Sequence, residues 1–200
     1  MQNNVYVTPY FPSIFFKKEV EDFKIIKEDI LDWIYNFQKN NSSYQRSNIG
    51  GWHSNINLFE NPDFQIYSTL IKKEVEYCLS QIIEDLNFKI SEGWININKK
   101  GDFNLTHTHP ESDLSAVFWI STKGEKSGRI EFENPCNFEQ NNLLSKIKKE
   151  VRDSFNLNKS HWIVPKDGVL LIFPSNIRHM VFPNQTFDDR ISIAFNIKLY

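Results

Sequence analysis

The segment that decides the fold is residues 88–98, FKISEGWININ. Apolar and polar residues alternate along it, as they do in a β-strand with one buried face. Before this segment, apolar residues recur at helical spacing; after it, short apolar runs are separated by Gly, Pro, Asn and Asp. The pattern therefore changes from helical to β at about residue 87.

Two helices are predicted before this change. Residues 19–40, EVEDFKIIKEDILDWIYNFQKN, carry apolar residues at intervals of three and four, the pattern of an amphipathic helix. The second helix is expected to begin at Asn61, a capping residue, and its apolar face continues to Leu86. A polar loop, residues 41–55, separates the two helices, and an extended strand interrupted by prolines is expected over residues 5–16.

Short strands dominate the rest of the chain. After residue 98 they are expected at 102–109, 114–121, 128–135, 161–165, 168–174, 179–183 and 190–200. A charged, loosely helical segment at 141–156 breaks the series. Helices followed by many strands predict an α+β, mainly β protein, in which two helices pack outside a β-sandwich or barrel.

We expect one domain over residues 1–200, because this length suits a single hydrophobic core. Its parts would be a mainly helical N-terminal layer over 1–87 and a β-core over 88–200, with an insertion near 137–160.

Composition excludes several classes of protein. A net charge of -2 and a pI of about 6.2 disfavour nucleic acid as the main partner. The two cysteines form no CxxC motif, so we expect no disulfide scaffold and a reducing, cytoplasmic setting. We expect neither a signal peptide nor a membrane span.

Two histidines lie one residue apart in residues 104–113, NLTHTHPESD. If this segment is a strand, His107 and His109 project from the same face and can chelate a divalent metal. His179, which follows a later strand and a short turn, is the natural third ligand. Imidazole ligands suit Fe, Zn, Ni or Cu, and a carboxylate ligand would favour iron further. The alternative is that these histidines are hydrogen-bonded residues at a rim.

Arg190 and Ser192 are expected to share one face of the last strand. A guanidinium and a hydroxyl placed in this way form a seat for a carboxylate. The alternative is an arginine paired with Asp188 or Asp189 at the entrance of the strand.

In combination, these motifs resemble the Fe(II)- and 2-oxoglutarate-dependent oxygenases. The segments that carry the resemblance are HTHPESDLSAVFWI, FPSNIRHMVFPNQTFDDRISIAFNI and SNIGGWHSN, and together they extend from about Gly50 to Asn196. They look most like an uncharacterised branch with an HxHP…H…RxS pattern. The resemblance implies a double-stranded β-helix, or jelly roll, with flanking N-terminal helices.

The resemblance also implies a ligand set for iron. His107 matches the first metal histidine of the family and His179 the distal one. The wider superfamily has His-x-Asp or His-x-Glu at the first ligand pair, whereas this chain has a second histidine. The remaining ligand is therefore His109 itself, or Glu111 with His109 as the leading ligand, or Asp113. We favour the three histidines.

By the same resemblance, Arg190 pairs with the far carboxylate of 2-oxoglutarate, and Ser192 completes the Arg-x-Ser arrangement. Asn96 and Asn104 are further candidates to hydrogen-bond this co-substrate. The implied activity is that of a dioxygenase that hydroxylates an unidentified substrate and releases succinate and CO2.

Trp52 and His53 follow two glycines in a polar loop. A mobile loop with an aromatic tip would close over a substrate. The alternative is a buried tryptophan that pins the loop to the core.

Two other functions are open: a three-histidine, cupin-like metalloenzyme that does not use 2-oxoglutarate, and a non-catalytic jelly-roll module. A small molecule or a protein side chain is favoured as substrate. Pairing through the C-terminal strand, which ends at Tyr200, would give a homodimer.

Overall fold

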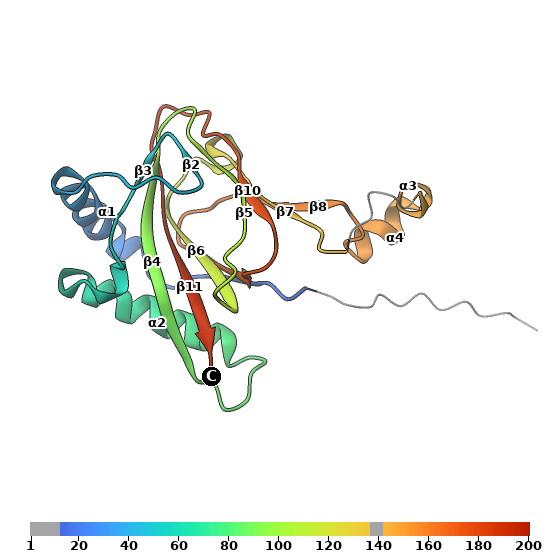
Figure 1. Ribbon diagram of the computed structural model, residues 1–200, viewed down its shortest axis with the longest axis horizontal. Helices are drawn as coiled ribbons and strands as arrows, with labels where there is room; N and C mark the ends of the chain where they lie inside the picture. Colours follow the sequence, from blue (N-terminus) through green and yellow to red (C-terminus); the bar gives the residue numbers. More distant parts are fainter. Residues whose placement is uncertain (1–12, 137–141) are drawn as a thin grey trace, which may run out of the picture.

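The computed structural model describes residues 13–136 and 142–200 (Figure 1). Most of the strand predicted over residues 5–16 lies outside these residues, as do the first residues of the predicted insertion. The first described strand, β1 (Phe16–Glu19), pairs antiparallel with β9 (Val169–Pro174).

The first helix, α1 (Phe23–Asn40), starts four residues later than predicted. The reason is that Glu19 belongs to β1, where it pairs with Val169 of β9. The helix buries Phe23, Ile30 and Ile34, which lie on one face because they are spaced by whole helical turns.

The second helix begins as predicted but ends early. The Asn61 side chain accepts a hydrogen bond from the Asp63 backbone N–H at 2.9 Å and caps a single 3-10 turn, η2 (Pro62–Phe64). This turn leads into α2 (Gln65–Leu79). The prediction that the helix continues to Leu86 is wrong, because Asp85 has a φ of 48°, which an α-helix does not allow.

Eight strands, β4 to β11, follow the helices, and with β1 to β3 they form two antiparallel sheets. The larger sheet has the order β1, β9, β6 (Leu114–Ser121), β11 (Arg190–Leu199), β4 (Phe88–Asn98), β3 (Trp52–His53). The smaller sheet has the order β2 (Asn48–Ile49), β5 (Phe103–His107), β10 (His179–Val181), β7 (Ile130–Glu133), β8 (Ser160–Ile163). The structure is thus mainly β, as predicted.

The last strand, β11, lies in the middle of the larger sheet. It pairs with β4 on one side and with β6 on the other. A homodimer formed by pairing along β11 is therefore excluded over residues 191–197, because the backbone groups there already bond to strands of the same chain. Dimerisation by another surface stays a prediction.

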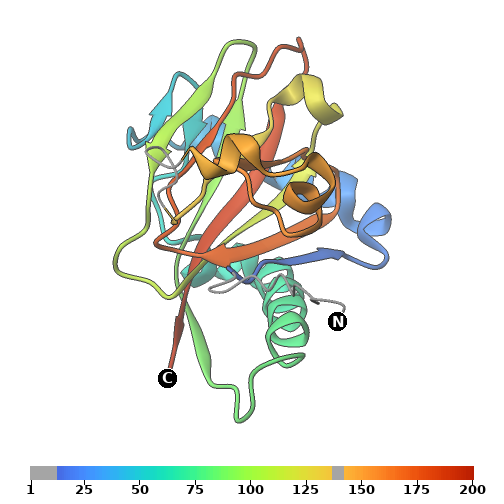
Figure 2. The ribbon, with the colours of Figure 1, turned by 90° about the vertical axis from the view of Figure 1, so that its right-hand side faces the viewer.

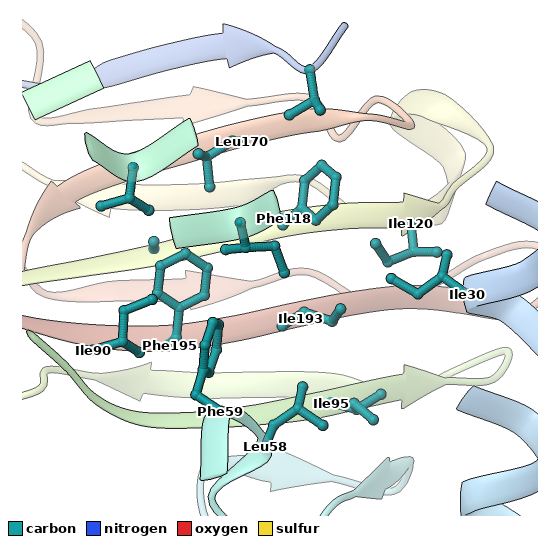
Figure 3. Close-up of a cluster of buried hydrophobic side chains, with 14 of the residues drawn as sticks. Ile30, Leu58, Phe59, Ile90, Ile95, Phe118, Ile120, Leu170, Ile193 and Phe195 are labelled. Atoms are coloured by element: carbon teal, nitrogen blue, oxygen red, sulfur yellow. The ribbon is translucent and has the colours of Figure 1, made fainter. Parts of the chain in front are cut away.

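The main core lies between the larger sheet and the helices (Figure 3). Apolar side chains of β4, β6, β9 and β11 meet Ile30 of α1 and Leu58 and Phe59 of another 3-10 turn, η1 (Leu58–Glu60). The opposite face of the larger sheet faces the smaller sheet. A second, smaller cluster there includes Phe132 and Phe173. Apolar residues fill only part of the space between the sheets, and the remainder is the cavity described below.

Two short helices, α3 (Leu143–Lys146) and α4 (Lys149–Ser154), lie between β7 and β8. They sit on the side of the molecule opposite α1 and α2 (Figures 1 and 2). A last 3-10 turn, η3 (Gly124–Ser127), joins β6 to β7. In the described part of the chain, no helix has the length and apolarity needed to cross a bilayer.

Replacing Phe195 by alanine is expected to destabilise the protein by ~3–5 kcal/mol, because its ring is fully buried against Phe59 and would leave a cavity. Urea denaturation measures this loss. Ile66→Ala is the control, since this side chain is 74% exposed and its truncation should change the free energy of unfolding by less than ~0.5 kcal/mol. Equal losses in both variants would contradict the assigned core.

Candidate metal centre

Three histidines from two segments of the chain converge between the two sheets. His107 is the last residue of β5, His179 is the first of β10, and the two are directly opposed in the antiparallel pair. His109 lies two residues beyond the end of β5, where its backbone N–H donates to Ser175 O at 2.9 Å. One ligand atom from each of the three lies within 4.8 Å of the others, so a single metal ion fits among them.

Hydrogen bonds fix the tautomer of two of these rings. Nδ1 of His107 lies 2.6 Å from Leu105 O, and Nδ1 of His179 lies 2.9 Å from Ile177 O. Because a carbonyl oxygen only accepts, Nδ1 carries the proton in each ring. Nε2 is then left with a free lone pair, which is the form that binds a metal.

His109 is held differently, since its ring makes no hydrogen bond to a described residue. It packs instead against Trp94, with ring centroids 5.6 Å apart. Trp94 in turn stacks on His53 at 5.6 Å, with only 13° between the ring planes. The orientation of His109 therefore depends on aromatic packing.

Burial keeps the three histidines neutral. It lowers the pKa of His179 to about 3 and that of His109 to about 4, and the neighbouring His107 adds to both effects. Burial also lowers the pKa of His107, against a smaller opposing effect of its bond to Leu105. Near neutral pH no proton has to be displaced before a metal binds.

Neither predicted carboxylate lies in the cluster. Asp113 Oδ2 accepts a hydrogen bond from the Leu199 N–H at 2.8 Å, which holds this carboxylate at the end of β11. Glu111 is exposed and lines an outer groove. Among the described residues, the cluster of potential metal ligands consists of histidines alone.

Arg190 is buried at the other end of the same cavity, with 2% of its surface exposed. Its Nη1 donates to three carbonyl oxygens, those of Ser127 at 2.6 Å, Phe182 at 2.9 Å and Gly128 at 3.2 Å. Its Nη2 is buried and has no hydrogen-bond partner among the described residues. Burial lowers the pKa of Arg190 to about 10, so the guanidinium stays charged at neutral pH.

The alternative pairing of Arg190 with the preceding aspartates is not formed. Asp189 accepts a hydrogen bond from Tyr35 at 3.1 Å, and Asp188 lies 3.8 Å from the Lys123 ammonium. Both carboxylates therefore have other partners. The positive charge of Arg190 is uncompensated by direct contact, and a buried N–H donor faces a cost of about 1–3 kcal/mol until an acceptor reaches it.

The cavity between Arg190 and the histidines has a volume of about 230 Å³. Ser192, Asn96 and Asn104, all singled out from the sequence, line its walls. Other residues that line the cavity, and that no sequence motif singled out, are Arg46, Glu92 and Gly128.

Gly128 has a role that only the structure reveals. Its φ is +88°, and a Cβ at this position would collide with Phe182 O and with Nη1 of Arg190. A glycine is therefore required where three carbonyls surround the guanidinium. The sequence does not reveal this role, because a glycine just before a strand is also typical of an ordinary turn.

The Gly-Gly-Trp segment shapes its loop, and only the next residue, His53, lines the cavity. Gly50 has a φ of +68°, and a Cβ there would collide with Asp102, so glycine lets the loop lie against that residue. Trp52 is not at a mobile tip: its Nε1 donates to Asn41 O at 3.0 Å and its ring packs on Phe37. His53, in contrast, is buried and lines the cavity.

Comparison with protein families gives one match. Residues 92–196, about half of the chain, match a family described as "Putative 2OG-Fe(II) oxygenase". The chain belongs to this family. Fe(II) and 2-oxoglutarate are the cofactors that define it. All three histidines and Arg190 lie within the matched residues, whereas Trp52 and His53 precede them. No curated protein matches the sequence.

Solved structures of 2OG-Fe(II) oxygenases share the fold. A prolyl-4-hydroxylase from Pseudomonas putida is 12% identical, with a TM-score of 0.61 and 92% of each chain covered. HygX from Streptomyces hygroscopicus, solved with nickel and 2-oxoglutarate bound, is 10% identical, with a TM-score of 0.63 and coverage of 92% of this chain and 82% of that one. A viral collagen prolyl hydroxylase from Paramecium Bursaria Chlorella virus-1, in complex with 2-oxoglutarate, is 13% identical, with a TM-score of 0.55 and coverage of 92% and 94%.

Asn184 and Ser175 lie in the quoted motifs, and the structure gives each a role beside the cavity that the sequence did not indicate. Asn184 is almost fully buried, and its Nδ2 donates to Asn98 O at 2.9 Å and to Asp188 O at 2.8 Å. Ser175 hydrogen-bonds Ser112 O through its hydroxyl and accepts from the His109 N–H. Asn184 thus links its loop to the end of β4, and Ser175 links the turn after β9 to the loop after β5.

Acidification is expected to destabilise the metal-free protein between about pH 7 and pH 5. The folded-state pKa values of His109 and His179 lie below the ordinary value of 6.5, so the unfolded chain takes up protons first. The stability that these groups contribute is present above pH 6.5 and is lost as the pH falls towards their folded values. The interval from about pH 7 to pH 5 lies above the ordinary pKa range of carboxyl groups.

Thermal denaturation followed by circular dichroism measures this effect. The slope of Tm against pH should be positive in the wild type and shallower in the His109→Gln, His179→Gln double variant. Identical slopes in the two proteins would show that these histidines do not titrate as described.

Proposed function

We propose that this protein is an Fe(II)- and 2-oxoglutarate-dependent dioxygenase that hydroxylates its substrate. In the balanced reaction, 2-oxoglutarate, O2 and a substrate C–H bond give succinate, CO2 and a C–OH group. One oxygen atom enters succinate and the other enters the product. We further propose that residues 1–200 form a single oxygenase domain whose two sheets are a double-stranded β-helix.

One observation carries this proposal: a single cavity has three neutral histidines at one end and a buried arginine with an unpartnered N–H group at the other. The histidines supply three nitrogen ligands for a divalent metal. The arginine supplies a donor and a positive charge for an anion. 2-Oxoglutarate has the two matching ends, a keto acid that chelates metals and a distal carboxylate.

Charge balance favours the same co-substrate. Three neutral imidazoles leave the 2+ charge of a bound iron uncompensated, whereas the usual set of two histidines and one carboxylate removes one unit. 2-Oxoglutarate is a dianion: its keto-acid carboxylate would offset one unit of the metal charge, and its distal carboxylate would offset the charge of Arg190. We infer that binding of the metal and binding of 2-oxoglutarate strengthen each other, since such coupling is reciprocal.

The proposed roles of the residues follow from their positions. His107, His109 and His179 hold Fe(II), which supplies the oxygen-activating chemistry when bound. Nη2 of Arg190 donates to the distal carboxylate, and the Ser192 hydroxyl adds a hydrogen bond.

The cavity walls complete the site. We propose that Asn96 and Asn104 bind the co-substrate from the facing strands, although Nδ2 of Asn104 also donates to Ser47 Oγ at 3.3 Å. The rings of Phe132 and Phe173 pack on His179 with centroids 5.7 and 4.9 Å away and keep water from that side.

The all-histidine cluster also suits a cupin-like metalloenzyme that does not use 2-oxoglutarate. Such an enzyme would have no use for an arginine buried at 2% exposure with an unpartnered nitrogen. The experiment below separates the two functions.

The test is to add Fe(II) and 2-oxoglutarate to the metal-free protein under nitrogen and to record the visible charge-transfer band of the chelated iron. We expect the band in the wild type and its loss in His179→Ala. In Arg190→Ala the 2-oxoglutarate concentration needed for half of the band should rise at least ~10-fold, because a charge-assisted bond is lost.

Two controls keep this experiment decisive. His161→Ala changes an exposed histidine on β8 and should leave the band intact. His109→Asp creates the usual set of two histidines and one carboxylate and should retain iron. Bound iron without any band would favour the three-histidine enzyme, and no bound metal would favour a non-catalytic module.

Trp94→Leu is expected to weaken metal binding by ~10–100-fold, the size of effect seen when groups that orient a ligand are removed. The reason is that the His109 ring has no hydrogen bond to a described residue and, apart from the other two histidines, packs against Trp94. Titration with Co(II), followed by its absorption, measures this affinity without any turnover. Trp162→Leu is the matched control, because Trp162 is half exposed on β8. Equal affinities in the two variants would argue against this positioning role.

A further inference from the structure

An outer groove adjoins the metal cavity, and its volume of about 720 Å³ is roughly three times that of the inner cavity. The two hollows share Arg46, Glu92, Thr108 and His109. A molecule in the outer groove would therefore lie directly beside one of the three histidines. The inner cavity is of the size of a co-substrate, and the outer groove is of the size that holds a small-molecule substrate.

The walls of the groove are polar. Among the described residues that line it, Pro110 alone has a wholly apolar side chain. Asn57 lines the groove as well, and its Oδ1 is buried without a hydrogen-bond partner. A ligand would therefore gain little from apolar burial and would have to bring hydrogen-bond donors and charges of its own.

Four charged side chains line the groove, and two of them neutralise each other. Arg46 Nη2 donates to Glu92 Oε1 at 3.0 Å, and the other oxygen of Glu92 receives Asn196 Nδ2 at 3.4 Å. Each oxygen of Glu92 thus has a partner within the protein. Glu111 and Lys198, by contrast, form no hydrogen bond or ion pair through their side chains with any described residue. The groove keeps one free negative and one free positive charge.

We propose that this groove binds the substrate and that the substrate is a small zwitterion of the free amino acid class. Its cationic group would lie at Glu111 and its anionic group at Lys198, and an N–H group would satisfy Asn57 Oδ1. A peptide segment within a protein has neutral amides in place of these charges and would leave both side chains unpaired. This inference rests on the proposed function, because the groove matters only if the histidines hold the reactive metal.

The test uses the complex of Fe(II) and 2-oxoglutarate under nitrogen. Each standard amino acid is added to a separate sample. Its N-acetyl derivative and its methyl ester, each of which lacks one of the two charges, are tested in further separate samples. We expect one free amino acid, or a few similar ones, to shift the charge-transfer band and to stimulate succinate formation once air is admitted. Either derivative should bind at least ~10-fold more weakly, because one charge-assisted contact is lost.

Substitutions in the groove give the second readout. Glu111→Gln and Lys198→Gln should each weaken binding of the free amino acid at least ~10-fold and leave the band with 2-oxoglutarate unchanged. Glu28→Gln and Lys24→Gln, on exposed positions of α1 on the far side of the larger sheet, are matched controls with no expected effect.

The outcomes distinguish this inference from the proposed function. Absence of the band would overturn both. If no free amino acid shifts the band, the proposed zwitterionic substrate is wrong and the proposed function stands. The same holds if blocked derivatives, a polypeptide or a polycation shift the band equally well. Wild-type binding in both groove variants would overturn the assignment of the two charges.

Discussion

The pairing of β4 with β11 is the interaction on which the rest of the structure depends. These two strands form the longest ladder in the protein, from Arg190 opposite Asn98 to Leu199 opposite Phe88. Because side chains alternate along a strand, one face of the ladder builds the core and the other builds the site. On β11, Ile191, Ile193 and Phe195 enter the core against the helices, while the intervening side chains line the two hollows.

This arrangement anchors the polar face of the larger sheet to the core. The helices and η1 bury the apolar face of the larger sheet, so the polar face cannot shift without disturbing the core (Figure 3). A buried guanidinium and three neutral histidines are costly to bring together in an apolar setting. The cost is offset by carbonyl oxygens around Arg190 and by those behind two of the histidines. Contacts within the protein itself therefore hold these side chains around the cavity.

Part of the site could be predicted because it depends on local spacing. His107 and His109 are two residues apart, and Arg190 and Ser192 are two residues apart, so strand geometry alone directs each pair to one side. The third histidine was found from its order after a strand. The carboxylate alternatives could not be excluded in this way, because only the hydrogen bond from Leu199 shows that Asp113 points elsewhere.

Other features have no local signal. Trp94 and His53 are far apart in the sequence, yet their rings stack on each other, and Trp94 packs against His109. The start of the first helix also differs from the prediction, because pairing of β1 with β9 takes a residue, Glu19, that was placed in the helix. In each case a long-range contact outweighs a local preference.

The sequence by itself determined the mainly β class and the change of period near residue 87, and it singled out the three histidines and the arginine as candidates. These follow from side-chain type and from repeats of two or 3.6 residues, which do not depend on distant parts of the chain. Only the tertiary structure decided that the histidine cluster lacks a carboxylate and that Arg190 keeps an unpartnered nitrogen. It also decided that an outer groove with two free charges adjoins the cavity at His109. These features depend on which strands become neighbours, and that is fixed by packing of the whole chain.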